Sequence, residues 1–202
     1  MLNKESEYTY VTSKDADVEN GDFGKNVGAD IDTEKMSIRH GGLDEGGGSS
    51  VLDDMIEGNS SIHLVSNVKS VADRAMDFKQ HLESVDFPNA TTIGDSAFFY
   101  CTVLTSVNLP NVTTIGSAAF SQCSALTSVD LPNATTIGSA AFFKCSALTS
   151  VNLPKVTNIG DNAFGSISRT TVINIGAAEG EIAGAPWGAP SGVTINYGVK
   201  EA

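Results

Sequence analysis

The stretch LTSVDLPNATTIGSAAFFKCSA, residues 126–147, is one copy of a unit that recurs every 22 residues. The other copies read LESVDFPNATTIGDSAFFYCTV (82–103), LTSVNLPNVTTIGSAAFSQCSA (104–125) and LTSVNLPKVTNIGDNAFGSISR (148–169), and the second and third of the four agree at 18 of 22 positions. A fixed period of this length predicts a solenoid in which each copy is one coil stacked on the next. Because its surface repeats, a solenoid favours binding or structural work over catalysis, which needs different residues converging on one point.

Each copy predicts the same sequence of short elements. Residues 128–131 predict a strand that ends at Pro132, and residues 135–137 predict a second strand. Residues 140–142 are expected to form a single helical turn with Ser139 as its N-cap. One phenylalanine per copy is expected to stack along the interior: Phe98, Phe120, Phe142 and Phe164.

Composition divides the chain into three segments. Residues 1–58 are acidic, glycine-rich and aperiodic, which predicts an N-terminal arm and linker; residues 59–169 carry the repeats; residues 170–202 keep strand-like stretches and predict a C-terminal β cap. Of the net charge of −12, the arm carries −9, from 14 Asp and Glu against five Lys and Arg. Residues 59–202 hold 10 acidic against seven basic residues, so this part carries −3.

These features exclude several partner classes. Binding to a phosphate backbone requires clustered Lys and Arg, which the chain lacks, so no nucleic acid is expected. Because no run approaches the roughly 20 apolar residues of a membrane helix, no membrane insertion is expected. The first 20 residues show neither the basic nor the apolar region of a secretory signal.

The repeat pattern L-x-x-V-x-L-P-x-x-x-x-x-I-G-x-x-A-F-x-x-C resembles the BspA-like branch of the leucine-rich repeat family over residues 82–169. A weaker copy at 66–76, with Ala72 and Met76 in place of the Gly and Phe, suits an end cap. The resemblance implies a β-rich leucine-rich-repeat solenoid of short parallel strands with single helical turns, here with an extended N-terminal arm. That family includes surface adhesins and phage-encoded proteins, and residues 51–58 and 184–190 are similar to the phage and prophage versions.

The repeats contain few candidates for chemistry. Cys101, Cys123 and Cys145 are expected to form a ladder of buried free thiols, since their side chains should point inward in parallel and no second ligand pair completes a zinc site. Gly94-Asp95-Ser96 begins like a hydrolase motif, but position 96 varies between copies and no His follows it. We therefore expect no enzyme, no cofactor and no metal.

The copies differ most at two neighbouring positions, which makes a candidate contact surface of Phe99, Tyr100, Phe143 and Lys144. Partial burial of Phe99, Tyr100 and Phe143 under the next coil is the equal alternative. In the arm, Tyr8, Tyr10, Val11 and Phe23 are the candidate docking residues, since residues 8–12 could pair with the sheet edge of a partner.

Two functional hypotheses follow. The first is a phage virion protein, a head or tail fibre. Its arm would dock on other virion proteins, and its repeat rod would be displayed for binding a host protein or glycan. The alternative is a bacterial cell-surface adhesin or host-interaction module. In the first case we also expect a homo-oligomer, because multivalent display strengthens weak contacts.

Overall fold

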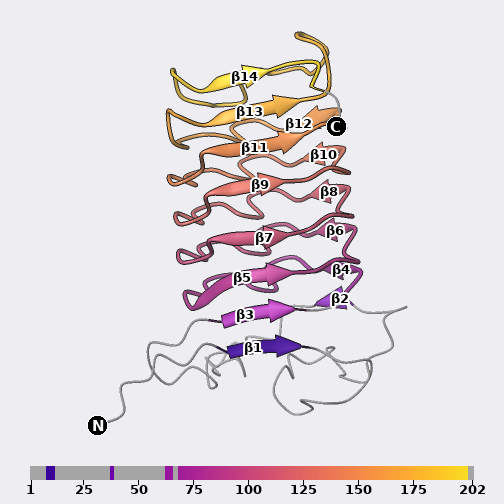
Figure 1. Cartoon of the computed structure of the whole chain (residues 1–202), viewed down its shortest axis with the longest axis vertical. Coiled ribbons are helices and arrows are strands. Elements are labelled where there is room, and N and C mark those ends of the chain that lie inside the picture. The colour runs from indigo at the N-terminus through magenta and orange to yellow at the C-terminus, as the bar shows by residue number, and fades with distance from the viewer. Residues whose placement is uncertain (1–7, 12–36, 39–61, 66–67, 200–202) are drawn as a thin grey trace.

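The structure, a computed structural model, describes residues 8–11, 37–38, 62–65 and 68–199. It is a parallel-strand solenoid of stacked coils, as the 22-residue period predicts (Figure 1). Each repeat coil contributes one longer strand and one very short strand. The longer strands are β1 (Tyr8–Val11), β3 (Ile62–Val65), β5 (Leu82–Asp86), β7 (Ser106–Asn108), β9 (Ser128–Asp130), β11 (Ser150–Leu153), β13 (Val172–Ile175) and β14 (Thr194–Asn196). The short strands are β2 (Ser37–Ile38), β4 (Ser70–Val71), β6 (Thr92–Ile93), β8 (Thr114–Ile115), β10 (Thr136–Ile137) and β12 (Asn158–Ile159).

The strands form three parallel sheets whose register follows the repeat. The longer strands make the sheets β1-β3-β5-β7 and β14-β13-β11-β9, and the short strands make the sheet β12-β10-β8-β6-β4-β2. Ser84 pairs with Ser106 one period later, and Ser150 pairs with Val172, which pairs in turn with Thr194. The 22-residue step thus continues through β13 and β14, although the sequence there no longer matches the repeat.

The N-terminal segment contributes two strands, each at the end of one of these sheets. Tyr8–Val11 pairs in parallel with Ile62–Val65, and Ser37–Ile38 pairs with Ser70–Val71. The stretch expected to pair with a partner's sheet therefore pairs here with a sheet of its own chain. The remaining candidate docking residue, Phe23, lies outside the described residues.

The expected helical turn is wrong. The structure has no helix among the residues it describes, and residues 139–144 form consecutive turns. In this segment the N–H groups of alternate residues donate to the next coil, from Ala140 to Asp161 at 2.9 Å and from Phe142 to Ala163 at 2.8 Å. Ala140 and Lys144 also have positive φ angles of 55° and 60°. Both features exclude the i to i−4 hydrogen bonds of a helix.

The N-cap role expected at Ser139 is wrong for the same reason. At the equivalent position one coil earlier, the N–H of Ser117 donates to the Asp95 carboxylate at 2.6 Å, and the N–H of Asp95 donates to Asp73 at 2.7 Å. The aspartate side chains at this slot therefore join neighbouring coils. An N-cap would instead satisfy donors within its own segment.

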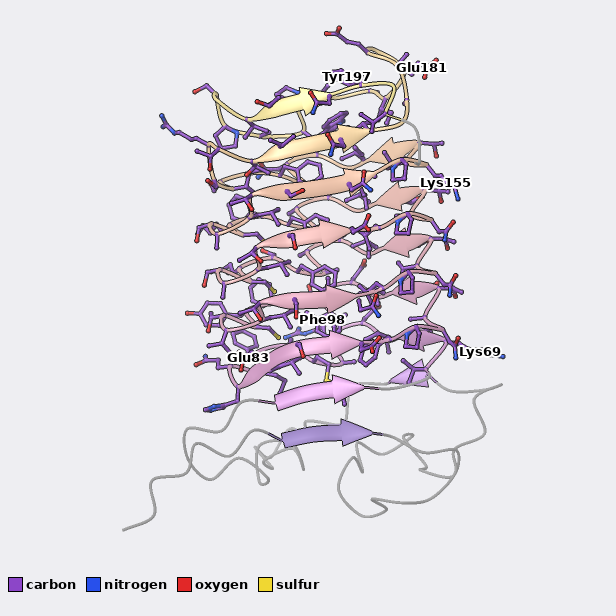
Figure 2. All side chains as sticks on the ribbon, viewed as in Figure 1. Lys69, Glu83, Phe98, Lys155, Glu181 and Tyr197 are labelled. Carbon is purple, nitrogen blue, oxygen red and sulfur yellow. The ribbon has the colours of Figure 1, made fainter. Side chains whose placement is uncertain are left out.

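The core is a stack of phenylalanine rings along the axis, as predicted. The rings of Phe98, Phe120, Phe142 and Phe164 are fully buried and nearly parallel, with centroids 5.0, 5.6 and 5.8 Å apart. Trp187 closes the C-terminal end of this stack edge-on, 6.4 Å from Phe164, and its ring N–H donates to the Ala183 carbonyl. Figure 2 shows Phe98 in the interior between the strand ladders.

The close spacing of the coils requires glycine after the short strands β6, β8, β10 and β12, whereas Ala72 follows β4. A Cβ atom added to Gly116 would lie 2.6 Å from the Asp95 nitrogen, and one added to Gly138 would lie 2.5 Å from the Ser117 nitrogen. Real Cβ atoms do not approach backbone this closely, so any side chain here would separate the coils. The Ile-Gly pair of the repeat is therefore a packing requirement.

We predict that Phe142→Ala lowers the free energy of unfolding by about 3–5 kcal/mol, because it opens a cavity between two buried rings. Denaturant unfolding followed by circular dichroism measures this change. The matched control is Phe78→Ala, because the Phe78 side chain is 51% exposed and its truncation should cost far less. Equal stabilities of the two variants would contradict the role of the ring stack.

Candidate functional site

The positions that differ between coils are collected at one edge of the solenoid. They directly follow the stacked core phenylalanine, in the turns that return the chain to the next longer strand. The second position of each pair has a positive φ of 57–64° at Tyr100, Gln122, Lys144 and Ser166. Because successive coils stack in register, these four side chains form one column across the coils, which we call the variable column.

An aromatic cluster occupies the N-terminal end of the variable column. Phe78 lies one period before Tyr100, and the two ring centroids are 5.3 Å apart. Phe99 contacts the Phe78 ring edge-on at 5.3 Å. Phe99 and Tyr100 are half-buried, while Phe78 is one of two large apolar residues that the described structure leaves exposed, with Val103. The exposed apolar surface is thus concentrated at this end of the edge.

The variable column carries a positively charged side chain two coils after Tyr100. The Lys144 ammonium lies 5.3 Å from the centroid of its neighbour Phe143, over the ring. Lys144 is exposed and Phe143 is half-buried. The contact holds the ammonium near the surface through its attraction to the ring electrons, while leaving it accessible to a ligand.

A shallow groove of about 330 Å³ runs along this edge. It combines the variable column with a second column of hydroxyl residues two positions later, and we call it the edge groove. Its lining residues are Tyr100, Thr102, Gln122, Ser124, Lys144, Ser146 and Ser166. The groove therefore crosses several coils and offers an aromatic ring, an amide, an ammonium and hydroxyl groups.

The structure brings the four predicted contact residues to this edge. Tyr100 and Lys144 line the edge groove, Phe99 belongs to the aromatic cluster, and Phe143 lies beneath the Lys144 ammonium. Phe99, Tyr100 and Phe143 are half-buried, as the alternative of partial burial expected, and Lys144 is exposed. Sequence reasoning missed Phe78 and the hydroxyl column, although Phe78 precedes Tyr100 by one period and could have been found by extending the repeat backwards.

The face formed by the longer strands has a different character. Its outward positions carry small polar side chains, and amides pair with carboxylates between coils: Asn108 donates to Asp86 and Asn152 donates to Asp130, both at 2.8 Å. Alternating Asn with Asp keeps neighbouring carboxylates apart. These polar groups satisfy one another, so the face offers fewer free groups to a ligand than the edge groove does.

A second groove, of about 640 Å³, lies at the C-terminal end between the short-strand sheet and residues 181–184. Asp161 and Glu181 line it, but the Glu181 carboxylate accepts from the N–H of Ala178 at 2.8 Å and so stabilises its own loop. Within the described ranges, His, Cys, Asp and Glu form no group of three that could hold a metal ion. Nor does the described chain contain a helix long and apolar enough to span a membrane.

The cysteine ladder is confirmed. Cys101, Cys123 and Cys145 are free and buried, and each thiol donates to a carbonyl of the preceding coil, those of Met76, Phe98 and Phe120, at 3.0–3.1 Å. Burial raises the pKa of Cys101 and of Cys145 to about 12, and it raises the pKa of Cys123 well above its ordinary value. The thiolate form needed for a nucleophile or a metal ligand is therefore strongly disfavoured.

Comparison with known proteins gives a family and a fold. The family profile described as "BspA type Leucine rich repeat region" matches residues 57–180 in six copies. A solved leucine-rich repeat protein of T. pallidum is 26% identical, with a TM-score of 0.58, and the match covers 71% of this chain and 72% of that one. A leucine-rich cell surface protein of Faecalibacterium prausnitzii is 27% identical over 54% of this chain and 43% of that one, with a TM-score of 0.34. No curated protein matches.

We predict that the buried thiols make the fold sensitive to alkaline pH. Below pH 9.0 the thiols are protonated in both states. Above pH 9.0 the unfolded thiols ionise, whereas the folded thiols, with a pKa of about 12 at Cys101 and Cys145 and well above 9.0 at Cys123, stay protonated. Stability should therefore be complete below pH 9 and fall as pH rises towards 12, by up to about 1.4 kcal/mol per pH unit for each thiol. Denaturant unfolding at a series of pH values measures this slope.

The control is the triple variant Cys101→Ala, Cys123→Ala and Cys145→Ala, which retains every other alkaline group. The difference between the two slopes isolates the thiols. Identical slopes, or rapid labelling of the native protein by a thiol reagent near neutral pH, would contradict their burial.

Proposed function

The chain belongs to the BspA-type leucine-rich repeat family, and on that premise we propose that it is a non-catalytic interaction module displayed at a surface. The observation that carries the proposal is the collection of the variable positions at one accessible edge. The core and the strand faces repeat from coil to coil, so they cannot distinguish one partner from another. The variable column differs in every coil, and the aromatic cluster supplies the aromatic anchors typical of contact surfaces.

Catalysis has no support at the edge groove. The catalytic arrangement sought here is a nucleophile beside a base, with donors for a developing negative charge. The groove holds hydroxyl groups and one ammonium, and its lining includes no His and no carboxylate. Ser96, the residue of the hydrolase-like motif, instead takes a φ of 55° within the turns between coils.

A second, finer proposal concerns where the module is displayed. We infer a phage particle as one location, with the chain acting as a head or tail fibre that is attached through its N-terminal segment. Two features support it: residues 1–58 differ in composition from the rod, and β1 stands at the end of its sheet, where a partner strand could pair with it. The bacterial cell surface is the alternative location, consistent with the adhesins of the family.

The surface role predicts saturable binding that depends on the edge. The full chain, fused to a fluorescent protein, is titrated onto intact cells of the organism that encodes it. We expect the double variant Tyr100→Ala, Lys144→Ala to lose about tenfold or more in affinity, because it removes an aromatic anchor and a cation. The control Ser128→Ala, Asn152→Ala alters the strand face and should bind as the unchanged protein does.

Equal binding by both double variants would remove the edge groove from the function. Absence of saturable binding to cells, together with absence from purified particles, would contradict the surface role itself.

The virion proposal predicts that particles carry the full chain and lose it when residues 1–48 are deleted. Immunoblots of gradient-purified particles, produced with either form of the gene, measure incorporation. Incorporation of the truncated chain would contradict docking through the N-terminal segment. If the full chain is absent from particles but present on intact cells, the location is the cell surface.

A further inference from the structure

We propose that the edge groove binds a neutral, linear β-1,4-linked glycan lying along the axis of the solenoid. The inference rests on the proposed surface role and names the ligand class for its contact surface. It follows from one juxtaposition. A half-buried tyrosine lies at one end of a groove whose other residues carry hydroxyl, amide and ammonium groups, and the positions of these residues recur once in each coil.

The backbone at this edge is already occupied. The N–H groups of Tyr100, Gln122 and Lys144 donate to the next coil, to the carbonyls of Ser121, Phe143 and Gly165, at 2.9, 2.7 and 2.8 Å. An extended peptide that adds to a sheet depends on free main-chain groups. The N–H groups along the variable column are therefore not free for a ligand, which disfavours a peptide bound as an added strand.

The side chains that remain suit a ligand rich in hydroxyl groups. The Ser124 hydroxyl donates to the Thr102 carbonyl at 3.2 Å, and the Ser146 hydroxyl donates to the Ser124 carbonyl at 3.5 Å. Each of these hydroxyl oxygens keeps lone pairs that can accept from a ligand. The amide of Gln122 can both donate and accept, and the Lys144 ammonium can donate. Sugar hydroxyls, which donate and accept, complement this set.

The aromatic cluster provides the apolar part of the site. Tyr100 lines the edge groove, and the exposed Phe78 extends its aromatic surface beyond the end of the groove. The ring faces carry electron density that attracts the weakly positive C–H groups of a sugar ring. Binding sites that pair such a platform with a few polar groups fix the orientation of their ligand.

Spacing and charge narrow the ligand class. The columns repeat at the strand separation of about 4.8 Å, which is close to the rise per sugar of a flat β-1,4-linked ribbon. Successive sugars can therefore meet the hydroxyl groups of Thr102, Ser124 and Ser146 on successive coils. The edge groove holds a single cation, which is too little positive charge to neutralise a polyanionic glycan or a nucleic acid, so a neutral glycan fits it better.

Isothermal titration of the full chain with cellohexaose, chitohexaose and mannohexaose tests the proposal. We expect saturable binding of at least one of the three. Tyr100→Ala should weaken that binding by about tenfold or more, whereas Tyr100→Phe, which keeps the ring, should retain most of it. The matched control is Tyr197→Ala, which removes a half-buried tyrosine from the last coil, outside the edge groove. Thermal unfolding of each variant confirms that it is folded.

Three results would overturn the proposal: no binding of any hexasaccharide, binding that Tyr100→Ala leaves unchanged, or binding of a decaproline peptide, in place of the hexasaccharides, that Tyr100→Ala abolishes. The last result would assign the edge groove to an extended peptide. If cell binding depends on Tyr100 and Lys144 while no hexasaccharide binds, the glycan inference fails and the surface role stands.

Discussion

The close approach of each coil to the one before it is the constraint on which the rest of the structure depends. Backbone groups of neighbouring coils meet directly, and a Cβ atom on Gly116 or Gly138 would collide with the preceding coil. At this spacing the phenylalanine rings come into stacking contact and each cysteine thiol reaches a carbonyl of the coil before it. Stability therefore resides in the interfaces between coils, as expected of a solenoid.

The close approach of the coils also determines which positions can differ from one coil to the next. A substitution inside the stack disturbs two interfaces, so the interior positions repeat, and the strand faces repeat because their side chains hydrogen-bond from coil to coil. The turns after the core phenylalanine point away from the stack and tolerate Tyr100, Gln122, Lys144 and Ser166 in equivalent places. A repeated scaffold thus presents a non-repeated edge, which is the combination that selective binding requires.

The errors of sequence reasoning share one physical cause. Ser-Ala-Ala-Phe has the composition of a capped helical start, and local propensity alone favours that interpretation. In the solenoid, however, the N–H groups of Ala140 and Phe142 donate to the neighbouring coil, so the segment forms turns with left-handed residues. The polar residue before them, expected as a cap, joins coils for the same reason. Interactions between copies outweighed preferences within one copy.

The sequence by itself determined the solenoid, its 22-residue register, the phenylalanine stack and the buried thiols, because periodic apolar positions can be buried together only when the copies stack. Tertiary structure alone decided how the edge is built. Different coils contribute Phe78, Tyr100 and the hydroxyl column. These side chains form one surface because of the direction in which the turns project from the stack. It also decided that Tyr8–Val11 pairs with Ile62–Val65, since strand pairing between distant segments leaves no periodic mark in the sequence.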